Sequence, residues 1–179
     1  MSQRIKDIFA AIHRPPETGK RVLALSKGDA ERIPLLPGVA MISIVDADSA
    51  QAVLPPYEFL LRLSFSDVDF LAHNLSDRAQ KKLGEAMTKA QGLEVNRFVR
   101  ALPESIHTVI VHCGAGVSRS CGVASALNAI YGFEVEEQRL KGANQSVKKL
   151  LIEVAKNQSR SKDNRRAKSK VLRCATKKE

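Results

Sequence analysis

A cysteine and an arginine frame a loop of small residues in the segment HCGAGVSRS, which spans residues 112–120. Glycines in such a loop let backbone N–H groups turn toward a common centre, and a helix starting directly after it adds the positive end of its dipole. A doubly charged oxyanion such as phosphate or sulfate fits this kind of cradle. We expect the anion to be bound by the loop residues Gly114, Ala115, Gly116, Val117 and Ser118.

Reactive side chains stand at both ends of this loop. Thiols at helix N-termini or beside cations have pKa values of about 3.5–7.5, so we expect Cys113 to be a thiolate near neutral pH that can attack phosphorus. Arg119 can offer a planar fork to two phosphoryl oxygens, which a lysine cannot do. Ser120 can hydrogen-bond the sulfur when it becomes a leaving group, and His112 can orient the loop and help to hold the thiolate. A buried, inert thiol is the alternative for Cys113.

The segments around the loop predict an α/β fold. Short segments rich in apolar and β-branched residues indicate strands at 21–25, 39–45, 57–65 and 108–111. Helical spacing of apolar residues indicates helices at 76–92, at 95–102, from near Ser118 to Gly132, and after Asn144. Strands that alternate with helices are typical of a central sheet covered by helices. We expect this sheet to be mixed.

Length and composition exclude several classes of protein. The chain has 179 residues, of which 44% are apolar, enough to bury one core without disulfide or metal staples. No apolar run reaches the roughly 18 residues of a membrane span, and the charged N-terminus lacks a secretory h-region. The three cysteines show neither a disulfide framework nor zinc-ligand spacing. We therefore expect a cytoplasmic protein without a metal ion or other cofactor.

The net charge of +10 is concentrated in one segment. Residues 156–179 hold ten basic and two acidic residues, whereas residues 1–155 hold 19 basic and 17 acidic ones. We expect a catalytic domain at 1–155 and a basic, disordered tail at 156–179. Charge that only keeps the chain in solution is the simplest interpretation of this tail. Electrostatic contact with nucleic acid or another anionic surface is the alternative, although no aromatic residue stands there to stack on bases.

The pattern H-C-x5-R-S resembles the signature of the cysteine-dependent protein tyrosine phosphatase superfamily, and HCGAGVSRS looks most like its dual-specificity branch. The resemblance is strongest over residues 108–131 and extends more weakly from about 39 to 155. It implies the phosphatase fold, with the loop between a strand and a helix, and a two-step reaction through a cysteinyl-phosphate. Phosphorylated proteins are the implied substrates.

The resemblance also implies a general acid on an upstream loop, after a strand. The segment LLRLSFSDVDF offers Asp67 and Asp69; Asp67 fits the family pattern better because it comes first, and Asp69 is the alternative. More than forty residues separate either aspartate from Cys113, longer than is typical of dual-specificity enzymes, and an extra helical stretch at about 76–102 fills the gap. This departure leaves the choice of acid open.

Two further residues have open interpretations. The segment GANQSVKKLL resembles the place where relatives carry an asparagine before the last helix, so Asn144 either braces the loop, caps the helix, or does both. Cys121 lies eight residues after Cys113 and is either a small helix-packing residue or a redox partner of the nucleophile.

The leading hypothesis is a phosphatase for phosphotyrosine, with phosphoserine and phosphothreonine as further candidates. The absence of lysine from the loop disfavours a phosphoinositide. An RNA 5′-phosphatase of the same superfamily, with the tail holding the nucleic acid, is one alternative. A non-catalytic phosphate-binding module is another, which the intact Cys113, Arg119 and Ser120 disfavour.

Overall fold

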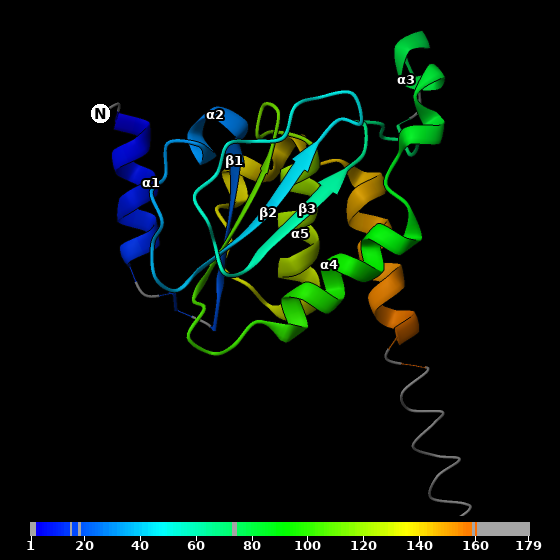
Figure 1. Cartoon of the computed structure of the whole chain (residues 1–179). Helices are drawn as coiled ribbons and strands as arrows, with labels where there is room; N and C mark the ends of the chain where they lie inside the picture. The colour runs from blue at the N-terminus through cyan, green and yellow to red at the C-terminus, as the bar shows by residue number, and fades with distance from the viewer. Residues whose placement is uncertain (1–2, 15, 18, 73–74, 159, 161–179) are drawn as a thin grey trace, which may run out of the picture.

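The computed structural model describes residues 3–14, 16–17, 19–72, 75–158 and 160 (Figure 1). Helices and strands follow in the order α1 (Gln3–His13), β1 (Arg21–Ser26), α2 (Lys27–Ala30), β2 (Val39–Val45), β3 (Leu60–Ser64), α3 (Asp77–Lys81), the 3-10 helix η1 (Leu83–Glu85), α4 (Lys89–Ala101), β4 (Thr108–Cys113), α5 (Arg119–Tyr131) and the 3-10 helix η2 (Glu137–Gly142). A final helix covers residues 145–158.

Within the described residues, the strands form one sheet in the order β1-β4-β2-β3, and every neighbouring pair is parallel. The expected α/β fold, with a central sheet flanked by helices, is confirmed. The expectation of a mixed sheet is wrong in this part of the chain, because each connection returns the chain to the edge where the previous strand began. All four strands therefore end at the same edge, so the segments that follow them come together there.

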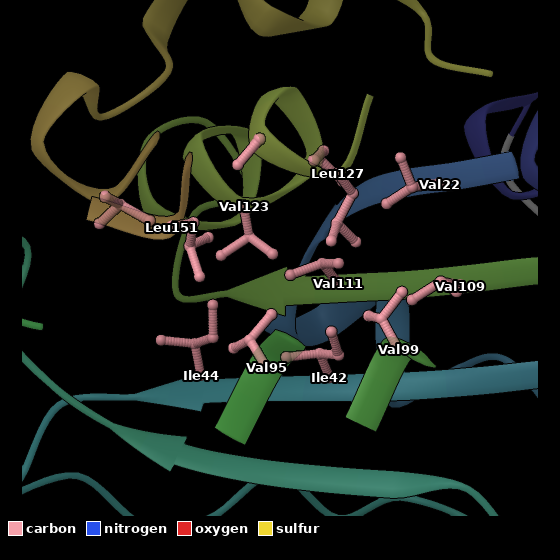
Figure 2. Packing of buried hydrophobic residues seen from close by; sticks show 14 of the residues in the cluster. Val22, Ile42, Ile44, Val95, Val99, Val109, Val111, Val123, Leu127 and Leu151 are labelled. Atoms are coloured by element: carbon pink, nitrogen blue, oxygen red, sulfur yellow. The ribbon is translucent and has the colours of Figure 1, made fainter. Parts of the chain in front are cut away.

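Helices cover both faces of the sheet. Helices α1 and α2 lie on one face, where Ile5, Ile8 and Ile12 pack against Leu23 and Met41. Helices α4 and α5 and the final helix lie on the other. Figure 2 shows side chains from these helices meeting the strands, including Val22, Ile42, Ile44, Val95, Val99, Val109, Val111, Val123, Leu127 and Leu151. The sheet is thus held rigidly between two apolar layers.

Helix α1 was not among the predicted elements. Its three isoleucines recur at helical spacing and are at most 4% exposed, so each contributes about 2 kcal/mol by burial. Arg21, which is 2% exposed, ties the end of this helix to β1 by donating to the carbonyl oxygens of Ala11 and Arg14. The periodic isoleucines were the signal that could have predicted it.

The segment at 76–92, predicted as one helix, is divided. Helix α3 and η1 are short, and α4 begins at Lys89, where Thr88 and Gln91 form a capping box. Gly92 does not end a helix but lies buried inside α4. A Cβ there would lie 2.7 Å from the Leu150 side chain, so the glycine allows α4 to pack closely on the final helix.

The boundary expected at residue 155 falls inside the final helix, which continues to 158. Residues 161–179, which hold most of the predicted basic tail, lie outside the described residues. In the described part of the chain, no helix has both the length and the apolar character needed to cross a bilayer.

Candidate active site

The predicted anion-binding loop, residues 113–119, connects the end of the central strand β4 to the start of α5. Backbone hydrogen bonds hold it at both ends. The Gly114 carbonyl accepts from the Lys27 N–H at 3.1 Å, and the Ser118 carbonyl accepts from the Asn144 N–H at 3.1 Å. Of the residues between its ends, Gly114, Ala115 and Val117 are exposed. The loop is therefore anchored to two other segments and open to solvent between them.

Gly116 sits at the tightest point of the loop. Its φ of +77° lies in the left-handed region, and a Cβ would come within 2.4 Å of the Ser26 backbone nitrogen. The Cys121 thiol lies within hydrogen-bond reach of two carbonyl oxygens, that of Gly116 at 3.4 Å and that of Arg139 at 3.2 Å. Burial raises the pKa of Cys121, which keeps this donor protonated. Cys121 is a free thiol in the structure and packs against the loop from α5.

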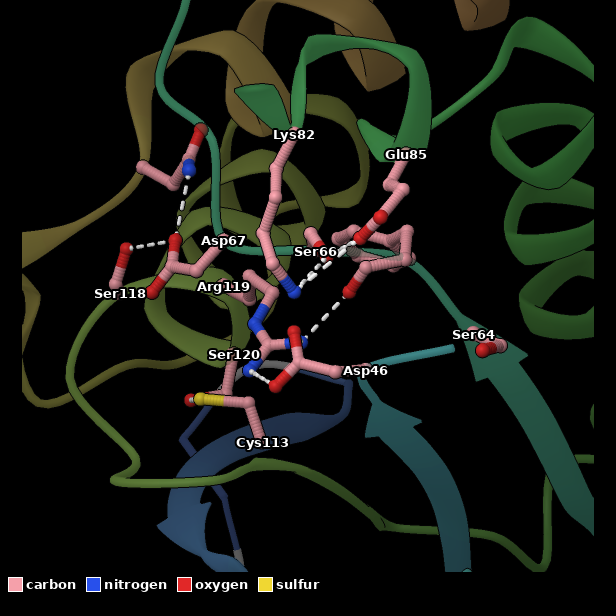
Figure 3. A network of polar contacts seen from close by, with 12 residues as sticks. Asp46, Ser64, Ser66, Asp67, Lys82, Glu85, Cys113, Ser118, Arg119 and Ser120 are labelled. Carbon is pink, nitrogen blue, oxygen red and sulfur yellow. Dashed lines mark hydrogen bonds and ion pairs between the residues drawn. The ribbon is translucent and has the colours of Figure 1, made fainter. Parts of the chain in front are cut away.

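Cys113, at the end of β4, is 2% exposed and also a free thiol. Its sulfur lies 3.2 Å from the hydroxyl oxygen of Ser120 in the first turn of α5 (Figure 3). Ser120 is fully buried, so this hydroxyl is fixed beside the sulfur. The two side chains that sequence analysis paired are brought together by the structure.

The guanidinium of Arg119 is held by groups that follow β2 and β3. Its Nη1 donates to Asp46 Oδ1 at 3.0 Å and to the Phe65 carbonyl at 2.6 Å, and its Nη2 lies 3.5 Å from Asp46 Oδ2 (Figure 3). The Nε atom is buried and has no partner in the described chain. Nη2 lies 3.8 Å from where a Cβ of Gly114 would be, so the guanidinium borders the loop. A buried N–H donor is therefore unused at the edge of the loop.

Asp46 was missed by the sequence analysis. It directly follows the buried strand β2, and parallel strands bring their carboxyl ends to one edge of the sheet. The position of an acidic residue at that strand end was the available signal. Without the strand order, however, nothing placed this strand end beside Arg119.

Asp67 lies over the same loop. Its Oδ1 accepts from the Ser118 hydroxyl at 2.6 Å and from the Asn144 side-chain amide at 3.0 Å. Figure 3 shows the Asp67 carboxylate and the Ser118 hydroxyl pointing toward each other. Of the two aspartates offered as the general acid, Asp67 is therefore the one that contacts the loop directly.

Asp69 is directed instead at the start of the final helix. Its carboxylate accepts from the backbone N–H groups of Gln145 and Ser146 at 2.9 and 3.1 Å, and from the Ser146 hydroxyl at 2.6 Å. Burial raises the pKa of Asp69, but the hydrogen bonds from Ser146, Gln145 and Leu71 outweigh it, so the pKa lies below its usual value. Asp69 thus stays ionised and satisfies N–H groups that a helix leaves unpaired.

Asn144 has both of the roles that the sequence left open. Its Oδ1 accepts from the Val147 N–H at 3.0 Å, which caps the final helix. Its Nδ2 donates to Asp67, and its backbone N–H donates to the loop carbonyl of Ser118. One residue therefore links the helix, the loop and the acidic segment.

His112 is fully buried, and neither ring nitrogen has a hydrogen-bond partner among the described residues. Because side chains alternate along a strand, its ring points to the face of β4 opposite Cys113. Burial lowers the pKa of His112 to about 4, so the ring is neutral. The role expected for His112, orienting the loop and helping to hold the thiolate, stays a prediction.

The described residues offer no cluster of three or more His, Cys, Asp or Glu side chains that could hold a metal ion. Figure 3 shows the Cys113 thiol, the Arg119 guanidinium and the carboxylates of Asp46 and Asp67 around the end of the loop.

Comparisons with known proteins add one finding. No model of a protein family matches the chain, and no curated protein matches it. Among solved structures, the chain is similar to a tyrosine phosphatase. That structure is described as "Crystal structure of Tk-PTP in the active form"; it shares 17% sequence identity, and the match covers 76% of this chain and 92% of that chain at a TM-score of 0.40.

Proposed function

We propose that this protein is a phosphoric monoester hydrolase in which Cys113 is the nucleophile, and that it acts on phosphotyrosine, with phosphoserine and phosphothreonine as further substrates. The observation that carries the proposal is the unused Nε donor of Arg119 beside the loop that holds the Cys113 thiol. Leaving a buried N–H unpaired costs about 1–3 kcal/mol, which a bound oxyanion would recover. The Asp46 and Phe65 contacts use the two Nη nitrogens, so Nε is the guanidinium nitrogen left for a bound oxyanion.

In the first step, the Cys113 thiolate attacks phosphorus and the bond between phosphorus and the ester oxygen breaks. The loop N–H groups and Arg119 stabilise the negative charge on the phosphoryl oxygens in the transition state. Asp67 gives its proton to the departing phenolate or alkoxide oxygen. Both hydrogen bonds to Asp67 go to Oδ1, which leaves Oδ2 to carry that proton.

In the second step, Asp67 takes a proton from a water molecule, whose oxygen attacks the phosphorus of the cysteinyl-phosphate. The S–P bond breaks, and the electron pair returns to the sulfur of Cys113. The Ser120 hydroxyl, 3.2 Å away, donates a hydrogen bond to the sulfur as its negative charge develops. Inorganic phosphate then leaves the loop.

Apolar side chains near the loop support an aromatic leaving group. Val117, within the loop, is 57% exposed, and Phe70, which follows Asp69, is 44% exposed. The segments that carry them meet where Ser118 donates to Asp67. A phenyl ring that follows the phosphate would contact these side chains, whereas a serine or threonine side chain would reach them less well.

The direct experiment measures phosphate release from para-nitrophenyl phosphate and from a phosphotyrosine peptide by the full chain. We expect turnover by the wild type and none by Cys113→Ser. Cys174→Ser, the same exchange in residues 156–179, is the matched control and should keep full activity. Activity that survives Cys113→Ser would overturn the proposal.

The same assay separates the substrate classes. Faster release from a phosphotyrosine peptide than from phosphoserine and phosphothreonine peptides is expected. Faster release from 5′-triphosphorylated RNA than from every peptide would replace the protein substrate with RNA. Measurable affinity for a phosphotyrosine peptide without turnover would instead indicate a binding module.

A further inference from the structure

The extra segment between the acidic residues and α4 returns to the candidate site. Its residues Lys82, next to η1, and Glu85, at the end of η1, lie against Ser66 (Figure 3). Ser66 belongs to the segment 65–69, which we call the acid loop because it carries Asp67 and Asp69. Nothing in the proposed reaction uses this contact.

Glu85 holds Ser66 in two ways. The Ser66 N–H donates to the Glu85 carbonyl at 2.8 Å, and the Ser66 hydroxyl donates to the Glu85 carboxylate. Lys82 completes the cluster, with its Nζ 3.3 Å from that carboxylate and 3.4 Å from the Ser66 hydroxyl. Ser66 is only 2% exposed, so its hydroxyl depends on Glu85 and Lys82 for hydrogen bonds.

The neighbours of Ser66 in the chain both reach the site. The Phe65 carbonyl accepts from Arg119, and the Asp67 carboxylate accepts from Ser118. The Phe65 N–H is also held by the Val45 carbonyl at 3.0 Å, so a displacement of Ser66 would chiefly move Asp67, the group that carries the proton. The hydrogen bonds from Ser66 and Lys82 lower the pKa of Glu85, so its carboxylate is ionised at neutral pH.

We propose that Glu85 is a positioning residue that, through Ser66, holds Asp67 of the acid loop in place beside Ser118 before substrate binds. This inference rests on the proposed function, because it assumes that Asp67 protonates the leaving group. Proton transfer depends on a donor held within hydrogen-bond reach of the leaving oxygen, so loss of the contact should affect the reaction where protonation matters most.

The test compares two aryl phosphates. Para-nitrophenolate is a good leaving group that needs little protonation, whereas phenolate is a poor one that needs the acid. For Glu85→Ala we expect kcat/KM for phenyl phosphate to fall by about tenfold or more, and kcat/KM for para-nitrophenyl phosphate to change by less than about threefold, because kcat/KM reports the first step, in which the leaving group is protonated. Glu85→Gln keeps an oxygen that accepts from Ser66 and should restore most of the loss. Glu94→Ala, a similar exchange at an exposed position of α4, is the control and should match the wild type on both substrates.

A double variant connects Glu85 to Asp67. In the Asp67→Asn background, Glu85→Ala should cause no further loss on phenyl phosphate, because the proton donor is already gone. Equal losses on both substrates, or additive losses in the double variant, would show that Glu85 only stabilises the fold and would overturn the inference. If Glu85→Ala does not fold, Ser66→Ala, which keeps the backbone contact, should show the same selectivity to a smaller degree.

The two proposals fail in different ways. If the wild type hydrolyses neither ester, or if Cys113→Ser remains active, the proposed function is wrong. If the wild type and Asp67→Asn behave as expected but Glu85→Ala equals the wild type on phenyl phosphate, only the role of Glu85 is wrong.

Discussion

Asp46 and Arg119 form an ion pair in which the carboxylate faces the Nη side of the guanidinium, with Oδ1 3.0 Å from Nη1. The Arg119 side chain is 6% exposed and that of Asp46 is 36% exposed, so the pair is half-buried. The Phe65 carbonyl shares the same nitrogen, and the Phe65 ring lies 6.0 Å from the guanidinium carbon. These contacts occupy the Nη nitrogens and leave the buried Nε without a partner in the described chain.

Replacing Asp46 tests whether this pair orients the arginine. We expect Asp46→Ala to lower kcat/KM for para-nitrophenyl phosphate by about 10–100-fold, because small displacements of an orienting group have effects of that size. Asp46→Asn, which keeps one acceptor, should lose less. Steady-state kinetics and vanadate inhibition measure the effect. An increase in activity would mean instead that Asp46 competes with the substrate for Arg119.

The two aspartates of the acid loop should behave differently when each becomes asparagine. Asp67→Asn should lower kcat for phenyl phosphate by about 100-fold or more and leave the thermal unfolding temperature almost unchanged. A variant that keeps wild-type kinetics would exclude Asp67 as the proton donor.

Asp69→Asn should act on stability. Asp69 satisfies N–H groups of the final helix, so we expect the variant to lose about 1 kcal/mol in the free energy of unfolding while keeping kcat for phenyl phosphate within a few-fold of the wild type. The folded pKa of Asp69 lies below the ordinary value of 3.8, so its stabilisation is present above that pH and is lost as the pH falls through the folded pKa. Urea unfolding at pH 7 and at pH 3 measures the difference between the two chains, which should shrink at the lower pH.

Gly116 and Gly132 form a matched pair, because both have a positive φ. A Cβ at Gly116 would collide with the backbone of Ser26, whereas one at Gly132 would meet nothing within 4 Å. We expect Gly132→Ala to cost about 1 kcal/mol of stability with normal activity, and Gly116→Ala to cost more and to abolish turnover. Thermal unfolding measures the loss of stability, and phosphate release from para-nitrophenyl phosphate measures the loss of turnover. Normal turnover by Gly116→Ala would mean that the loop tolerates a shift away from β1.

His112 should remain neutral through the physiological range. Its folded pKa of about 4 lies below the ordinary value of 6.5, so the unfolded chain binds a proton between these values that the folded chain does not. Stability from this group is therefore complete above pH 6.5 and is lost as the pH falls toward 4, with a full difference of about 3 kcal/mol. The ring resonances of His112 should not titrate between pH 8 and 5 in NMR spectra. His112→Phe should flatten the decline of stability over that range, and titration of the ring near pH 6.5 would contradict the expectation.

The sequence by itself determined the parts of this protein that are contiguous in the chain. The residue types from Cys113 to Ser120 predicted a loop between a strand and a helix, because the effects of two loop glycines and of a helix start are local. The effect of Gly132 at the end of that helix is local as well. It also offered capping as one of two roles for Asn144, since an N-cap bonds to an N–H only three residues away. In the same way the strands at 21–25 and 39–45 could be read from apolar content alone.

Only the tertiary structure decided which distant residues surround that loop. The strand order β1-β4-β2-β3 sets the end of β4 next to the end of β2, and so brings Asp46 to Arg119. It also gave the two aspartates different contacts. Asp67 contacts the loop at Ser118, whereas Asp69, only two residues later in the chain, contacts the start of the final helix. Such contacts depend on which parallel strands are neighbours and on how helices pack on them. The free energy that favours one arrangement over another comes from surface buried between residues that are far apart in the sequence.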